Sequence, residues 1–167
     1  MRPLDPGQIT AAFVNCSRRQ AAAITPPPGL DRLDWASLDF LGWRDPRAPK
    51  RAYLVLPHGD RTVGLALRAP GSSSRRAASG LCSLCHAVHP GNAVELLVAR
   101  KAGAAGRLHN TVGTYACADL ACSLYARGKR ALSLPQAERP GPERVLRLQQ
   151  RVAAFVDRVL DGSEVPA

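Results

Sequence analysis

The chain has 167 residues, with 23 lysines and arginines against 13 aspartates and glutamates, so its formal net charge is +10. This length suffices for one domain with its own core, and neither an apolar secretion signal nor the ~20 consecutive apolar residues of a membrane helix occurs. We therefore expect a cytoplasmic monomer with no membrane partner, and the positive charge favours RNA, the ribosome or an acidic protein surface as a partner.

The first predicted element is a short helix within residues 5–22. Asp5 suits its N-cap and Pro6 its first position. Apolar side chains then recur on one face of it: Ile9, Phe13 and Cys16. A run of three prolines at 26–28 ends the helix. We interpret Cys16, which is far in sequence from the other cysteines, as a small buried apolar residue.

Large apolar side chains concentrate in the segment that follows. They are Leu33, Trp35, Leu38, Phe40, Leu41 and Trp43. Both tryptophans of the chain lie here, and folding favours the burial of such large apolar surfaces. The segment is therefore predicted to contribute to the hydrophobic core.

A β-hairpin is predicted next, from residues 51–56 and 62–68. The turn between them, residues 57–60, contains a proline and a glycine where a chain reversal requires them. Residues 70–79 then form a Gly/Ser/Arg-rich connector that contains Arg75 and Arg76 and is expected to be mobile. Within a single domain of residues 1–167, we assign 1–79 to the N-terminal helix and antiparallel strands.

The second half of the sequence predicts a knuckle, a hairpin and a helix, in that order. Two cysteines form a tight turn at 82–85, and strands are expected at 93–99 and 111–116. A glycine-containing reversal at 102–106 joins these strands, and a helix is expected to open at Cys117–Tyr125. This order is typical of a treble-clef zinc finger, which we place at residues 80–130.

Four cysteines are arranged as two pairs, Cys82 with Cys85 and Cys117 with Cys122, with thirty-one residues between the pairs. Two short loops that each present two thiolates can bind one Zn²⁺ tetrahedrally, at about 2.3 Å from each sulfur. All four ligand positions are then filled, so the ion stabilises the fold and leaves no vertex for substrate. With zinc and four thiolates, the net charge falls from +10 to about +8.

The same cysteines also match two other kinds of site. The sequence from Cys82 to His86 matches the attachment pattern of c-type haem, and Cys-x-x-Cys alone also occurs at redox sites. The haem interpretation leaves the second cysteine pair unexplained, and no βαβ pattern supports the redox one. His86 and His89 could each replace a cysteine as a ligand, but we expect them beside the metal shell or exposed. His58 is interpreted as a turn residue and His109 as a possible contact residue.

The last predicted element is a C-terminal helix within residues 140–161. Pro142 and Glu143 suit its first turn, and Gly162 its end. Apolar residues recur at three- and four-residue spacing: Val145, Leu148, Val152, Phe155, Val156, Val159 and Leu160. The fold class expected is therefore α+β, a small antiparallel sheet with a treble-clef zinc finger and a packed C-terminal helix.

Basic residues gather in the predicted finger, where residues 80–130 hold six lysines or arginines and two acids. We predict that a partner binds there, to Arg100, Lys101, Arg107, Asn110, Tyr125, Arg127 and Lys129. A solvated, merely solubilising role for the charges is the alternative. Acidic residues are scattered and no phosphate loop or nucleophile motif occurs, so we predict a binding protein rather than an enzyme.

Three segments carry a resemblance to a known family. They are residues 34–43, residues 81–85 and residues 110–125. They resemble the C-terminal treble-clef domain of the elongation factor G-binding proteins, the fusidic-acid-resistance family, and the resemblance covers about residues 30–160. In better-known members a helical bundle precedes this domain, whereas here only the short helix does.

The resemblance implies that the four cysteines bind zinc and that the domain docks on elongation factor G. In that family, docking helps release the factor from the ribosome when fusidic acid has trapped it there. We expect this protein to be a zinc-stabilised binding protein for elongation factor G that influences its release. The alternative is a zinc-finger protein that binds the ribosome or rRNA without elongation factor G.

Overall fold

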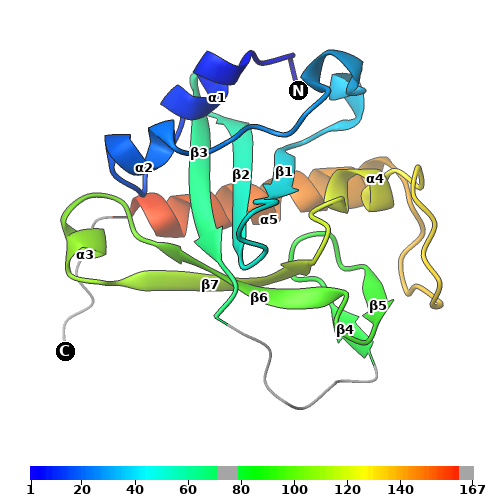
Figure 1. The fold of residues 1–167 in the computed structure, drawn as a ribbon. Coiled ribbons are helices and arrows are strands. Elements are labelled where there is room, and N and C mark those ends of the chain that lie inside the picture. The colour runs from blue at the N-terminus through cyan, green and yellow to red at the C-terminus, as the bar shows by residue number, and fades with distance from the viewer. Residues whose placement is uncertain (71–78, 162–167) are drawn as a thin grey trace.

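A bent antiparallel sheet lies between the N-terminal helices and a long C-terminal helix (Figure 1). The structure is a computed structural model that describes residues 1–70 and 79–161. The strand order of the main sheet is β1-β2-β3-β6-β7. Its strands are β1 (Leu41–Arg44), β2 (Arg51–His58), β3 (Arg61–Arg68), β6 (Val94–Arg100) and β7 (Thr111–Cys117). A two-stranded sheet pairs β4 (Ser79–Leu81) with β5 (Val88–Pro90).

Helices connect and cover the strands. The α-helices are α1 (Pro6–Ala11), α2 (Arg18–Ala22), α3 (Gly103–Arg107), α4 (Cys122–Ala126) and α5 (Pro142–Leu160). Two single turns of 3₁₀ helix are η1 (Leu30–Arg32) and η2 (Trp35–Ser37). The observed fold is α+β, with a small antiparallel sheet, a four-cysteine finger and a packed C-terminal helix, as the sequence predicts.

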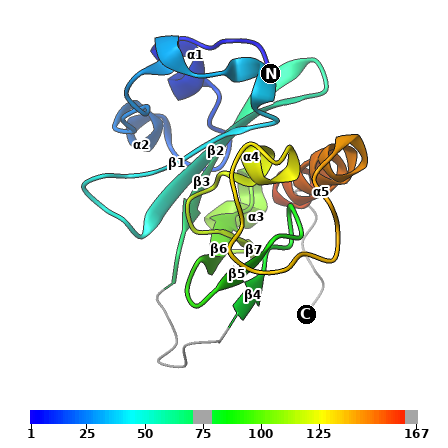
Figure 2. The same ribbon diagram turned by 90° about the vertical axis from the view of Figure 1, so that its right-hand side faces the viewer.

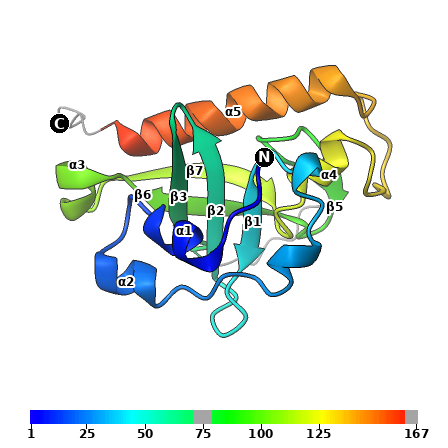
Figure 3. The ribbon, with the colours of Figure 1, turned by 90° about the horizontal axis from the view of Figure 1, so that it is seen from above.

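The two faces of the sheet bury different clusters of apolar side chains. Seen from above, α5 covers one face, and α1 and α2 cover the other (Figure 3). The apolar stripe of α5, which includes Leu148 and Phe155, packs into a core with Leu54 of β2 and Leu65 of β3. On the opposite face, Trp35 and Trp43 are buried with Ile9, Tyr53 and Val55. The prediction that both tryptophans belong to the core is confirmed.

The sheet bends where its two halves meet. β2 and β3 pair along their whole length, whereas β3 and β6 pair only at Leu67 with Ala99 and Arg68 with Val98. The β6–β7 hairpin consequently runs across the direction of β2 and β3 (Figure 1). This divergence leaves room on the N-terminal side of the sheet, between α2 and α3.

The prediction of one helix within residues 5–22 is wrong, because α1 and α2 are separate. Between them, backbone hydrogen bonds from Val14 N–H to Gly64 C=O (3.0 Å) and from Gly64 N–H to Ala12 C=O (2.8 Å) join the chain to β3. Ser17 then caps α2 by accepting from Gln20 N–H. Cys16 lies in this connection and is half-buried rather than enclosed in the core. Its burial raises the pKa of its thiol.

Other predicted boundaries shift in the structure. The hairpin strands β2 and β3 extend to His58 and from Arg61, so that the turn contracts to Gly59 and Asp60. The predicted reversal at 102–106 contains the short helix α3, and strands β1, β4 and β5 were not predicted. The connector at 70–79 and the predicted stop at Gly162 lie largely outside the described residues.

The first helix offers a test of the capping interpretation. Asp5 Oδ1 accepts from Gln8 N–H (2.8 Å), while Gln8 Oε1 accepts from Asp5 N–H (3.0 Å). Asp5→Ala should lower the free energy of unfolding by about 1 kcal/mol, because the N–H of Gln8 in the first turn of α1 would lose its acceptor. Asp5→Asn, which can still cap, should change it by only a few tenths, and urea unfolding measures both. Equal losses in the two variants would contradict the capping role.

Candidate metal centre

Three separate elements bring the four cysteines together. Cys82 and Cys85 lie in the turn between β4 and β5, Cys117 ends β7, and Cys122 begins α4. Their Sγ atoms all lie within 4.8 Å of one another, and all four residues are fully buried. Cys82 Sγ is 3.7 Å from Cys122 Sγ, and Cys85 Sγ is 3.5 Å from Cys117 Sγ. In Figure 2 the β4–β5 hairpin lies below α4.

These distances fit a tetrahedral zinc site. Four sulfurs at about 2.3 Å from one ion are about 3.8 Å apart, close to the separations observed here. Without a cation the four thiols cannot all ionise. Hydrogen bonds from Cys117 and Cys122 lower the pKa of Cys82 well below its ordinary value, whereas contact with Cys117, Cys82 and Cys85 and burial raise the pKa of Cys122. A divalent cation resolves this conflict by stabilising four thiolates together.

The first cysteine pair is shaped by the tight turn that the sequence predicts. Cys82 N–H donates to Ala87 C=O (2.9 Å), and His86 N–H donates to Cys82 C=O (2.9 Å). His86 has a positive φ of 54°, which closes the turn. Cys85 N–H also donates to Cys82 Sγ (3.4 Å), a contact that favours the thiolate form.

The second cysteine pair joins a strand end to a helix start. The prediction that a helix opens at Cys117 is wrong, since α4 begins only at Cys122. Between them, Leu120 has a φ of 57°, and Asp119 Oδ1 accepts from Ala121 N–H (3.0 Å). This turn reverses the chain, so that Cys122 Sγ returns to the sulfurs of the first pair.

Residues beside the sulfurs complete the site. His89 is buried, with its Nε2 3.2 Å from Cys117 Sγ, and its ring packs edge-on against Tyr125 at a centroid distance of 4.8 Å. His89 therefore lies beside the four sulfurs, as the sequence predicts, whereas His86 is only half-buried. His58 ends β2 and pairs with Asp157 (3.0 Å), and His109 follows α3 with a φ of 67°.

Arg144 contacts the metal centre and was not predicted from the sequence. It lies in the first turn of α5 and is only 1% exposed. Its Nε donates to Cys85 C=O (2.9 Å), and its Nη1 donates to Glu138 C=O (3.0 Å). A buried guanidinium thus holds the backbone of a metal-ligand residue. Position 144 precedes Leu148 by four residues on the apolar face, which was the signal available in the sequence.

The structure divides the predicted partner-binding residues into two groups. Arg100, Lys101, Arg107 and Asn110 lie around α3, at the end of the hairpin remote from Cys117. The seven residues of β7 separate the two ends by about 20 Å. The β6 and β7 ends are held together by a hydrogen bond from Lys101 N–H to Asn110 C=O (2.9 Å).

The second group, Tyr125, Arg127 and Lys129, makes contacts within the molecule. Tyr125 is buried and donates to Asp119 Oδ2 (2.7 Å), and its burial together with this hydrogen bond raises the pKa of its hydroxyl. Arg127 donates to both carboxylate oxygens of Asp39, which raises the pKa of its guanidinium. Lys129 binds Asp34 (2.8 Å) and Ser37. These contacts attach the end of α4 to the segment around η2.

Comparison with known proteins identifies the family. Among the described residues, no helix is long and apolar enough to cross a bilayer. No curated protein and no solved structure matches the chain significantly. The family model described as the FBP C-terminal treble-clef zinc-finger matches residues 8–159, a range that contains all four cysteines and the helices and strands around them. The four buried thiols are close enough together to bind the zinc ion of such a finger. The chain therefore belongs to the FBP C-terminal treble-clef zinc-finger family.

Proposed function

We propose that this protein is a zinc-stabilised binding protein that docks on translation elongation factor G and influences its release from the ribosome. The observation that carries the proposal is the zinc-finger family match over residues 8–159 together with a four-sulfur metal shell. Because four cysteines leave no open coordination position, the metal serves to fix the fold. A rigid surface loses less conformational entropy on docking than a flexible one does.

Two kinds of exposed side chain on the β6–β7 hairpin suit a protein partner. Tyr115 of β7 is 54% exposed although it is large and largely apolar. Its carbonyl accepts from Ser83 N–H (2.8 Å), so it is anchored to the cysteine turn. At the other end of the hairpin, Arg100 and Arg107 add exposed positive charge. Exposed aromatic and arginine side chains are enriched at protein interfaces, and the positive charge suits an acidic partner.

Calorimetry with purified elongation factor G tests the proposal. We expect saturable binding by the zinc-loaded protein at micromolar concentration, and at least tenfold weaker binding by Tyr115→Ala and by Arg107→Ala. Leu146→Ala is the matched control, because Leu146 is similarly exposed (55%) but lies on α5. Absence of binding heat with the folded wild-type protein would refute the proposal.

Direct binding to rRNA is the second candidate function. It is favoured by Arg100 and Arg107, which form no ion pair with a carboxylate within residues 1–70 and 79–161. Binding dominated by phosphate contacts would weaken steeply with salt, with a log–log slope that follows the number of contacts. Association with ribosomes that lack elongation factor G, with such a slope, would favour this candidate over the first.

A further inference from the structure

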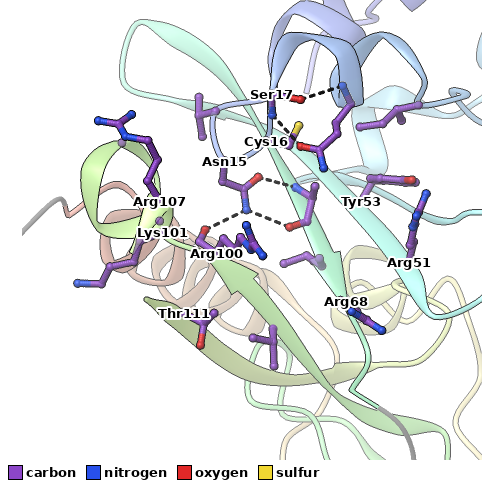
Figure 4. Close-up of a pocket in the computed structure, with 18 of the residues that line it drawn as sticks. Asn15, Cys16, Ser17, Arg51, Tyr53, Arg68, Arg100, Lys101, Arg107 and Thr111 are labelled. Atoms are coloured by element: carbon purple, nitrogen blue, oxygen red, sulfur yellow. Dashed lines mark hydrogen bonds between the residues drawn. The ribbon is translucent and has the colours of Figure 1, made fainter. Parts of the chain in front are cut away.

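A cleft of about 980 Å³ opens on the N-terminal side of the sheet, remote from the four cysteines. The connection between α1 and α2, with α2 itself, forms one wall (Figure 4). Strands β2, β3 and β6 form the floor, and α3 closes the end. The cleft exists because β3 and β6 diverge after only two paired positions.

Asn15 holds the cleft open in a defined shape. Its Nδ2 donates to Ala66 C=O of β3 (2.9 Å) and to Arg100 C=O of β6 (3.1 Å), and its Oδ1 accepts from Ala66 N–H (2.8 Å). One side chain thus occupies the gap between the two strands and attaches the N-terminal wall to both, as the dashed lines in Figure 4 show. The wall and the floor of the cleft are therefore held together by specific hydrogen bonds.

The lining of the cleft is strongly cationic. Five basic residues line it, and no aspartate or glutamate does: Arg51, Arg68, Arg100, Lys101 and Arg107. Lys101 pairs with Asp161 (3.7 Å). Among the described residues, the four arginines form no ion pair with a carboxylate. In Figure 4, Arg51, Arg68 and Arg100 lie around the same opening.

Two of these arginines face each other across a pair of strands. Arg51 of β2 and Arg68 of β3 are directly opposite each other in the antiparallel register. Like charges at such positions repel each other, and this destabilises a sheet. An anion bound between the two guanidinium groups would offset this repulsion, because each guanidinium can form two parallel hydrogen bonds with a phosphate.

The rest of the lining is largely apolar. Ile24, Leu67 and Val98 contribute aliphatic surface, and Tyr53 contributes its ring. Burial and the hydrogen bond to Asp45 raise the pKa of Tyr53 to about 12, so it remains a neutral hydroxyl. The volume lies in the range of pockets for single small ligands. A ligand that suits the site carries several negative charges and a flat or apolar group.

We propose that this cleft binds a nucleoside polyphosphate, with its phosphates on Arg51, Arg68 and Arg100 and its base or sugar on the apolar floor beside Tyr53. The site is separate from the metal centre and goes beyond the proposed function. Its key arginines at 51 and 68 are not among the predicted docking residues, so the two proposals can fail independently.

Calorimetric titration of the zinc-loaded protein with ATP and with GTP tests the proposal. We expect saturable binding of at least one of them in a 1:1 ratio, weakened about tenfold or more by Arg51→Ala and by Arg68→Ala. Arg139→Ala changes the net charge equally but lies outside the cleft, and should leave affinity unchanged. The thermal midpoint provides a second measurement, because a bound nucleotide should raise it in wild type and less in either cleft variant.

Both cleft variants should fold normally, since Arg51 and Arg68 are exposed and substitutions at such positions usually change stability only slightly. Inorganic tripolyphosphate and a short oligoribonucleotide distinguish the possible ligands. Tripolyphosphate bound as tightly as both nucleotides would overturn the role of the apolar floor. An oligoribonucleotide bound much more tightly than either nucleotide would identify an RNA site, and no nucleotide binding at millimolar concentration would overturn the proposal altogether.

Discussion

Removing the metal is expected to abolish cooperative folding of the finger and to destabilise the whole domain. Structural zinc contributes about 10–16 kcal/mol in finger peptides, which is comparable to the total stability of a typical domain, about 5–15 kcal/mol. The four cysteines here belong to the same buried core cluster as Leu54, Leu97 and Phe155, so their loss would open the main core. A strong chelator should therefore cause loss of near-UV circular dichroism and a large fall in the thermal midpoint.

Single cysteine variants test which residues bind the metal. Cys85→Ser should lose stoichiometric zinc and lower the thermal midpoint by far more than Cys16→Ser does. Cys16 is the matched control because it is the one cysteine outside the cluster and is only half-buried. Elemental analysis should find one zinc per chain in the wild type and in Cys16→Ser. Metal-free wild-type protein with unchanged stability would contradict the zinc assignment.

The metal cluster could be predicted from the sequence because the two cysteines of each pair are close together in the chain. A Cys-x-x-Cys turn and a second pair at a strand end fix the direction of four sulfurs within short segments. The long helix α5 was predictable for a similar reason, since its apolar residues repeat at three- and four-residue spacing from Val145 to Leu160. Both features depend on neighbours in the sequence rather than on the packing of distant parts.

The features that the sequence did not predict depend on distant contacts. The split between α1 and α2 follows from hydrogen bonds between residues 12–14 and Gly64 of β3, which no local pattern reveals. Tyr125 and Arg127 were predicted to face a partner because they are polar and close in sequence to basic residues. The structure adds hydrogen bonds to Asp119 and Asp39 that the sequence did not reveal, and a partner role for the two residues stays a prediction.

Arg144 illustrates the same difficulty at the metal centre. An arginine in the first turn of an amphipathic helix usually remains solvated, so its position on the apolar face of α5 was only a weak signal of burial. Here the helix end packs against the cysteine turn, so the guanidinium is enclosed and donates to Cys85 C=O. Four thiolates and one Zn²⁺ carry a net charge of about −2, and a buried cation beside them compensates part of it.

Arg144→Met should consequently lower the free energy of unfolding by about 3–5 kcal/mol. The variant keeps most of the apolar stem but removes the donors to the carbonyls of Cys85 and Glu138, and each charged hydrogen bond contributes about 1.5–3 kcal/mol. Zinc affinity should also fall, by about 10–100-fold, as is typical when a group that supports a metal ligand is lost. Urea unfolding and competition with a zinc indicator measure the two effects separately.

Two further variants identify the cause of the loss. Arg144→Lys keeps the positive charge but cannot donate to both carbonyls as a fork, so an intermediate loss is expected if both charge and geometry matter. Arg151→Met is the control, because Arg151 lies on the same helix, is only half-buried and makes a longer contact with Leu84 C=O (3.4 Å). If Arg144→Met and Arg151→Met lower stability and zinc affinity equally, the guanidinium at position 144 has no special role at the metal centre. A selective loss at 144 would show that the metal shell extends beyond its four sulfurs to the first turn of α5.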